Sequence, residues 1–169
     1  MERLSSKIVA EGFFFLEGPR WHEGRLWFSD MMGGMVYALD GEGRAEAIVA
    51  VPERPSGLGF LPDGTPLVVS MRDRCLYRIA AGALALHADL SELAAGDIND
   101  MVVDAQGRAY VGNMGFDYWR DPDAFVPSTV IVVEPDGAAR IAADGFDFPN
   151  GMAIDSKNGR LIVAESYGK

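Results

Sequence analysis

Four short segments of this 169-residue chain resemble one another, and each opens with a polar residue. The openings are Glu17 in EGPRW, Ser56 in SGLGF, Asn99 in NDMVV and Asn150 in NGMAI. Carboxylate and amide oxygens, which three of the four carry, are the ligands that hard divalent cations such as Ca²⁺ and Mg²⁺ prefer. If the fold brings the openings together, the sequence predicts a cation site built from oxygen atoms.

The openings are 39, 43 and 51 residues apart, a spacing that indicates propeller blades. Each opening is followed by an apolar stretch, a tight turn and a second apolar stretch, the turns being HEGR, PDGT, AQGR and KNGR. Glycine in such turns adopts positive φ at little cost, which a short antiparallel hairpin needs. Each unit is therefore predicted to begin with a β-hairpin.

Two further strands follow in each of the three complete units, and no convincing amphipathic helix lies between them. Four antiparallel strands in a repeat of about 40 residues are typical of an all-β propeller. We predict a single partial propeller domain over residues 1–169, with about three and a half blades. Its parts are a closing N-terminal strand within 1–17, blades at 18–52, 56–90 and 99–144, and an incomplete blade at 150–165.

Composition and charge limit the partners. The formal net charge is −10 and no cluster of Lys and Arg occurs, so nucleic acid is not expected to bind. The sequence shows neither a signal peptide nor an apolar run of about 18 residues, so we expect a cytoplasmic protein without a membrane partner. The single cysteine, Cys75, is expected to be a core thiol. Open strands at both ends of the chain favour self-association.

In a propeller the first strand of each blade lines the central channel, so the four openings should converge at one end. The second strand runs back to the same end, which is expected to bring Asp30, Asn113 and Glu165 there too. Such a ring of oxygens suits Ca²⁺ or Mg²⁺ better than Zn²⁺, which favours Cys and His in structural sites. His22 and His87 are expected at the surface.

Three motifs resemble the N-terminal motifs of the SMP-30/gluconolactonase family: LEGPRW at 16–21, INDMVVDAQGRAYVGNMG at 98–115 and PNGMAID at 149–155. The similarity extends from about Lys7 to the end of the chain. It implies a six-bladed propeller that binds one divalent cation in its channel and hydrolyses lactones of sugar acids or related small molecules. Ca²⁺ is the favoured ion, with Mg²⁺, Mn²⁺ or Zn²⁺ as alternatives.

The resemblance also implies roles for single residues. Glu17 and Asn150 match metal ligands of the family, and Asn99 matches an asparagine that contacts substrate. Two residues before Asn99 the family often has an arginine, but this chain has Asp97, which removes a bidentate donor and argues against gluconolactone itself. Asp117 retains an acidic residue that faces the sugar in relatives.

The remaining metal ligand of the family is an Asp that also serves as general base, and it belongs to a later blade, beyond Lys169. Within this chain Asp100 is the weak candidate for that base. The resemblance thus predicts an N-terminal portion of a metal-dependent lactone hydrolase that acts on a small lactone or sugar acid. Two alternatives remain open: a non-catalytic propeller fragment that binds a small molecule or peptide, and a metal-free propeller like strictosidine synthase.

The segment FDYWRDPDAFVPS at 116–128 lengthens the third blade between its second and third strands. Binding residues often lie on long loops over a rigid scaffold, so this loop could form a pocket wall. Its aromatic side chains could equally pack the loop against the rim of the blade. The sequence leaves both interpretations open.

Overall fold

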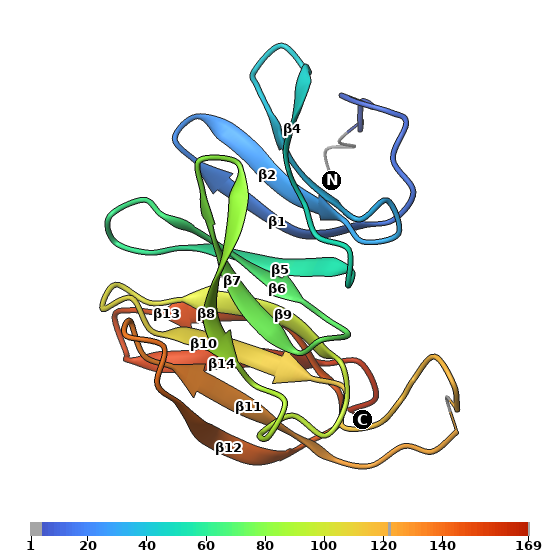
Figure 1. Cartoon of the computed structure of the whole chain (residues 1–169), viewed down its shortest axis with the longest axis vertical. Coiled ribbons are helices and arrows are strands. Elements are labelled where there is room, and N and C mark those ends of the chain that lie inside the picture. The colour runs from blue at the N-terminus through green and yellow to red at the C-terminus, as the bar shows by residue number, and fades with distance from the viewer. Residues whose placement is uncertain (1–4, 122, 169) are drawn as a thin grey trace.

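The computed structural model describes residues 5–121 and 123–168, which form fourteen β-strands in four antiparallel sheets (Figure 1). The first sheet consists of β1 (Leu16–His22), β2 (Arg25–Asp30), β3 (Met35–Leu39) and β4 (Ala45–Ala50). The second consists of β5 (Pro55–Phe60), β6 (Pro66–Ser70), β7 (Cys75–Ala80) and β8 (Ala83–Asp89). The third consists of β9 (Ile98–Val103), β10 (Ala109–Asn113), β11 (Ser128–Val133) and β12 (Ala139–Phe146). The last is the hairpin of β13 (Pro149–Asp155) and β14 (Arg160–Glu165).

Each four-stranded sheet is a meander in chain order, and the sheets follow one another as the blades of a propeller (Figure 1). The first strands form the contacts between blades: β1 lies against β5, β5 against β9, and β9 against β13. This arrangement confirms the predicted all-β fold, a partial propeller. The first blade begins at Leu16 rather than at residue 18, because Leu16 already pairs with Asp30 of β2. Within the described residues no helix has the length and apolarity to cross a bilayer.

Glycines on the first strands let neighbouring blades approach closely. A Cβ atom on Gly18 would lie 2.6 Å from the carbonyl oxygen of Ser56, and one on Gly57 would lie 2.5 Å from the backbone nitrogen of Met101. Contacts this short are shorter than any real Cβ tolerates, so these positions require glycine. The absence of side chains here sets how closely the first strands can pack.

Apolar side chains fill the space between the blades, and their removal from water is the main force that holds the blades together. The cluster between the first two blades contains Val36, Val49, Val51, Leu58, Val68 and Ile79. A larger cluster between the second and third blades is centred on fully buried Leu67, Val69, Leu76, Met101, Val111 and Ile131. In each strand, the apolar residues of the alternating pattern are thus the ones that face a neighbouring blade.

We call the end of the sheets at which β1, β5, β9 and β13 begin the mouth. At the opposite end, hairpin turns are closed by aspartates whose carboxylates accept backbone N–H groups two residues further on. These bonds link Asp40 to Glu42, Asp63 to Thr65, Asp104 to Gln106 and Asp155 to Lys157. In the first hairpins the expected glycines, Gly24, Gly64, Gly107 and Gly159, have positive φ. The predicted turns are therefore formed.

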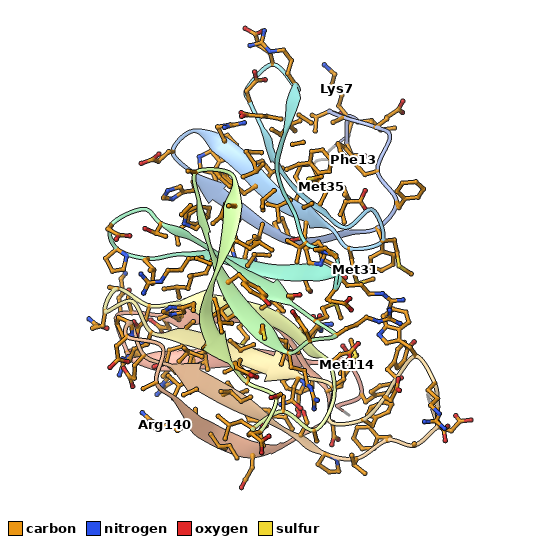
Figure 2. The ribbon with its side chains drawn as sticks, in the orientation of Figure 1. Lys7, Phe13, Met31, Met35, Met114 and Arg140 are labelled. Carbon is orange, nitrogen blue, oxygen red and sulfur yellow. The ribbon has the colours of Figure 1, made fainter. Side chains whose placement is uncertain are left out.

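The N-terminal segment differs from expectation. A closing strand was expected within residues 1–17, but residues 5–15 contain no strand, and residues 1–4 lie outside the described part. The segment is instead attached to its own blade. The N–H groups of Phe14 and Phe15 donate to the carboxylate of Asp30 at 3.1 and 3.0 Å. Phe13, labelled in Figure 2, packs edge-on against Phe28. The N–H groups that a partner strand would bind are bound here by the side chain of Asp30 in β2.

The two ends of the blade stack expose apolar surface. On the first blade Leu16 and Trp21 are 52% and 69% exposed, and Leu16 lines a mostly apolar hollow of about 280 Å³. On the last hairpin Ile162 is 57% exposed. Both faces have the alternating apolar pattern that elsewhere in the chain is covered by a neighbouring blade.

Candidate functional site

The four polar openings occupy the same place in their strands. Glu17, Ser56, Asn99 and Asn150 are each the second residue of β1, β5, β9 and β13. Because these strands are neighbours and all begin at the mouth, their second residues follow one another in an arc along it. The sequence repeat is thus also a repeat in space.

A buried hydrogen-bond chain connects the first three blades at the mouth. The hydroxyl of Ser29 donates to the backbone oxygen of Ser56 at 2.7 Å, and the hydroxyl of Ser56 donates to Oδ1 of Asn99 at 3.1 Å. All three side chains are at most 5% exposed. Because Oδ1 of Asn99 is used as an acceptor, its Nδ2 is the atom that can donate to a ligand.

The carboxyl group of Glu17 is within the electrostatic reach of Asp100. Burial raises the pKa of Glu17, and the nearby charge of Asp100 raises it further. Two acidic groups that are close together and partly removed from water favour a bound cation or a proton. Burial and the charge of Asp100 thus both disfavour the ionised form of Glu17.

Asp100 is fixed from two sides. Its Oδ1 accepts the N–H of Met101 and Nη2 of Arg20, each at 2.8 Å. Arg20 belongs to β1, so its guanidinium crosses β5 to reach β9, where it also donates to the backbone oxygen of Met101. Burial raises the pKa of Asp100, while the charge of Arg20 opposes that rise. The candidate base is thus one half of an ion pair between blades.

Asn150 is partly buried at the start of β13. Its Nδ2 donates to the hydroxyl of Ser166 at 3.0 Å, which leaves its carbonyl oxygen available to a cation. The position next to β9 places this oxygen on the same arc as Asn99.

The two remaining candidates, Asp97 and Asp117, are close together. Burial raises the pKa of Asp97, the indole N–H of Trp119 lowers it, and the charge of Asp117 raises it again. Trp119 donates to Oδ2 of Asp97 at 3.0 Å, and Oδ1 of Asp117 accepts the N–H of Arg120. Both carboxylates therefore lie where the loop after β10 meets the start of β9.

The ends of the second strands do not join this arc through their side chains. Asp30 binds the N-terminal segment and Gly33, Asn113 binds Thr129 and Gly115, and Glu165 accepts the N–H of Asp147. The chain does return to the mouth as expected. The side chains of Asp30, Asn113 and Glu165 bind nearby backbone groups instead, so the ring of oxygen ligands at the mouth is smaller than predicted. Within the described residues no group of three or more His, Cys, Asp or Glu could hold a metal ion.

The family model for the SMP-30/gluconolactonase/LRE-like region matches residues 15–169, nearly the whole chain. The chain belongs to the SMP-30/gluconolactonase/LRE-like family. This confirms the resemblance drawn from the three motifs. Comparison with curated proteins gives no match.

Solved structures with the same fold include members of this family. A gluconolactonase from Xanthomonas campestris has a TM-score of 0.79 at 23% identity, over 95% of this chain and 58% of its own. A putative gluconolactonase of structural-genomics origin has a TM-score of 0.78 at 22% identity, over 95% and 59%. Calcium-binding regucalcin from Agrobacterium tumefaciens has a TM-score of 0.66 at 23% identity, over 93% and 58%. The chain thus spans less than two thirds of each of these structures.

The sequence alone did not indicate three residues that contact the candidate site residues or their neighbours: Arg20, Arg54 and Trp119. Arg20 was overlooked because its partner is 80 residues away in the chain. Arg54 lies two residues before Ser56, as Asp97 lies two residues before Asn99, so alignment of the repeats could have identified it. Trp119 lies in the long loop after β10, and the loop sequence alone does not indicate its contacts with Asp97 and Arg54.

Proposed function

We propose that this chain is part of a divalent-metal-dependent lactone hydrolase and supplies two metal ligands and the first substrate contacts. The observation that carries the proposal is the common strand position of Glu17, Ser56, Asn99 and Asn150 along one mouth. Membership of a family whose model is named for gluconolactonase supports it.

The residues present fit part of a cation shell. Glu17 offers a carboxylate whose neighbour, Asp100, disfavours its ionised form, and a divalent cation would stabilise both charges. Asn150 offers a carbonyl oxygen. An all-oxygen set favours Ca²⁺ over Zn²⁺. Ca²⁺ takes six to eight oxygen ligands, so further ligands must come from water, substrate and other blades.

A bound cation would polarise the lactone carbonyl and lower the pKa of a bound water. The chain's own residues position the substrate. Asn99, held by Ser56, directs its Nδ2 as a donor, while Asp97 and Asp117 accept hydroxyl groups. Asp100 remains paired with Arg20 and acts as a fixed charge beside Glu17. We propose that the general base is an Asp outside this chain, in a blade beyond Lys169.

The test is hydrolysis by the chain joined to the C-terminal blades of a relative, with a panel of lactones and Ca²⁺, Mg²⁺, Mn²⁺ or Zn²⁺. We expect turnover that a chelator abolishes. Glu17→Gln should abolish activity and Asn150→Ala should reduce it strongly, because each removes a ligand from a shell that needs many oxygens.

Glu42→Gln is the matched control, because Glu42 lies in an exposed turn at the opposite end. It should leave activity unchanged. Hydrolysis that persists in chelator, or a silent Glu17→Gln, would refute the proposal. In that case a binding function for the mouth takes its place.

A further inference from the structure

The outer strands β4 and β8 each contain a bulge at the same position. Opposite the second and third residues of β3 and β7, the pairing skips one residue of the outer strand, which is Ile48 in β4 and His87 in β8. The backbone oxygen of each skipped residue lies near the turn between the third and fourth strands of the next blade. A Cβ atom on Gly82 would lie 3.9 Å from the oxygen of Ile48, and one on Gly137 would overlap the oxygen of His87. Because a bulge redirects the side chain that it carries, these two residues occupy equivalent places between blades.

His87 is half-buried at this place, although the sequence predicts a surface position. Its Nδ1 accepts the Nε–H of Arg78, in β7, at 3.0 Å. A guanidinium is always charged and has only donors, so this ring nitrogen has to carry a lone pair. The imidazole is therefore neutral, with its proton on Nε2. That Nε2 is buried and has no hydrogen-bond partner in the described part of the chain.

Arg78 also holds the third blade. Its Nη2 donates to the backbone oxygen of Pro135, in the turn between β11 and β12, at 2.7 Å. One guanidinium thus joins the outer strand of the second blade to a turn of the third. Arg78 lines a hollow of about 340 Å³ that Asp63 and Pro135 also line. The charge of Arg78 already acts on the carboxylate of Asp63, so the hollow offers the guanidinium a second partner.

A proton on Nδ1 of His87 is incompatible with this arrangement. It would remove the acceptor of Arg78 and place a second positive charge beside the guanidinium. Burial lowers the pKa of His87 and the charge of Arg78 lowers it further, while the charge of Asp136 raises it. The other charged side chains on the neighbouring turns act on other groups: Asp63 on Arg78, Glu134 on Arg140, and Asp104 on Arg108. Among the described residues, Asp136 is thus the acidic group that favours protonation of His87.

We propose that His87 and Arg78 form a proton-sensitive contact between the second and third blades. Uptake of a proton from solvent at Nδ1 breaks the bond from Arg78, and the guanidinium then leaves Pro135 for the hollow. In the first blade Ile48 makes the corresponding contact with an apolar side chain, so the response to pH belongs to one blade interface. The same two blades are joined at the mouth by the bond from Ser56 to Asn99. This inference does not rest on the proposed function.

Nitrogen NMR of the imidazoles in the whole chain tests the starting state. The chain has two histidines, so His22→Gln leaves one imidazole to be read. At about pH 7.5 we expect the proton on Nε2 and none on Nδ1. On acidification Nδ1 should take up its proton at a lower pH in the folded chain than in the urea-unfolded chain. The carbonyl carbon shift of Pro135 should change with the same midpoint, because its donor leaves.

Variants assign the titration to the arginine. Arg78→Met should raise the midpoint of His87, because the neighbouring charge and the donor are both removed. Arg140→Met is the matched control and should leave that midpoint unchanged. Arg140, labelled in Figure 2, is an exposed cation of β12 whose partner is Glu134.

Urea unfolding at several pH values tests the consequence for the blades. The wild type is compared with His87→Ile, which copies the residue of the first blade. A histidine that binds its proton less readily in the folded state lowers stability as the pH falls through its usual pKa of 6.5. The folded-to-unfolded ratio of the wild type, relative to that of His87→Ile, should therefore fall about threefold or more between about pH 7.5 and about pH 5.5. The other titrating groups are common to both chains and cancel.

A proton on Nδ1 at neutral pH, or the same pH dependence in the wild type and His87→Ile, would overturn the inference. A midpoint that Arg78→Met leaves unchanged would also overturn it, because burial alone would then set the titration. A Pro135 carbonyl that does not respond to protonation of His87 would show that the blades stay joined, and would overturn it as well. The NMR titration of the wild type and of Arg78→Met decides the matter if His87→Ile does not fold.

Discussion

Replacing Arg20 by Met should destabilise the chain because it leaves Asp100 as a buried charge without its partner. Met retains the apolar stem of the arginine while removing the guanidinium. The side chains of Arg20 and Asp100 are 23% and 10% exposed, so this pair lies nearer to a buried than to a surface ion pair. A broken buried pair costs about 3–5 kcal/mol, and an exposed pair under about 1 kcal/mol. Since Asp100 keeps its bond from Met101, we expect a loss of about 2–3 kcal/mol.

The loss should depend on pH in a defined direction. Burial raises the pKa of Asp100, and removing Arg20 removes what opposes that rise. An acid with a raised pKa in the folded state is destabilising while ionised, and this penalty disappears as the pH falls through that pKa. The deficit of Arg20→Met should therefore be complete at pH 7 and shrink as the solution is acidified.

Urea unfolding at several pH values measures this effect. Arg44→Met, which breaks two exposed ion pairs, with Asp40 and Glu42, should change stability by less than about 1 kcal/mol. The double variant Arg20→Met with Asp100→Asn should recover at least half of the loss, because it removes the unpaired charge. A double variant no more stable than Arg20→Met, or a deficit that grows on acidification, would refute the reasoning.

Three further predictions concern the contacts between blades and the exposed face of the first blade. Gly57→Ala should lower the free energy of unfolding in urea by about 2–3 kcal/mol, because its Cβ would overlap the backbone nitrogen of Met101; an unchanged midpoint would contradict this. Ser56→Ala should lower thermal stability by about 1–2 kcal/mol, because it leaves the buried Oδ1 of Asn99 without its donor, and wild-type stability would show that bond to be unimportant. Leu16→Glu should reduce self-association of the chain through its exposed first blade, which light scattering would detect as a lower mean mass; an unchanged mass would exclude this face.

Much of the fold could be predicted because each blade repeats its local signals. Turn glycines and alternating apolar residues determine hairpins through neighbours only a few residues away. Glu17, Asn99 and Asn150 were placed on one arc for the same reason: an equal position in equivalent strands gives an equal position in space. These inferences needed no knowledge of how one blade contacts another.

The contacts that escaped prediction depend on packing between distant segments. Arg20 reaches Asp100 only because glycines allow three first strands to lie close together. Asp30 was expected to face the mouth, but two backbone N–H groups of the N-terminal segment lie nearer to its carboxylate. That segment has the apolar pattern of a strand, yet a strand also requires a free edge to pair with. The sequence pattern alone does not reveal which side chain will accept the hydrogen bonds of a given stretch of backbone.

Acid acts in opposite directions on the aspartates that close the hairpin turns and on three carboxyl groups at the mouth, those of Glu17, Asp97 and Asp100. Hydrogen bonds from Arg44, Thr65 and Asn158 hold the pKa values of Asp40, Asp63 and Asp155 below their usual range, so these turns lose stability as the pH falls through those lowered values. At the mouth, burial raises the pKa values of Glu17, Asp97 and Asp100, so protonation there removes repulsion and desolvation. On acidification these mouth carboxyl groups are therefore protonated first, which lowers the cost of burying them. The turn aspartates are protonated only at lower pH, and the turns then lose stability. If a cation binds at the mouth as proposed, mild acid should release it well before the blades unfold.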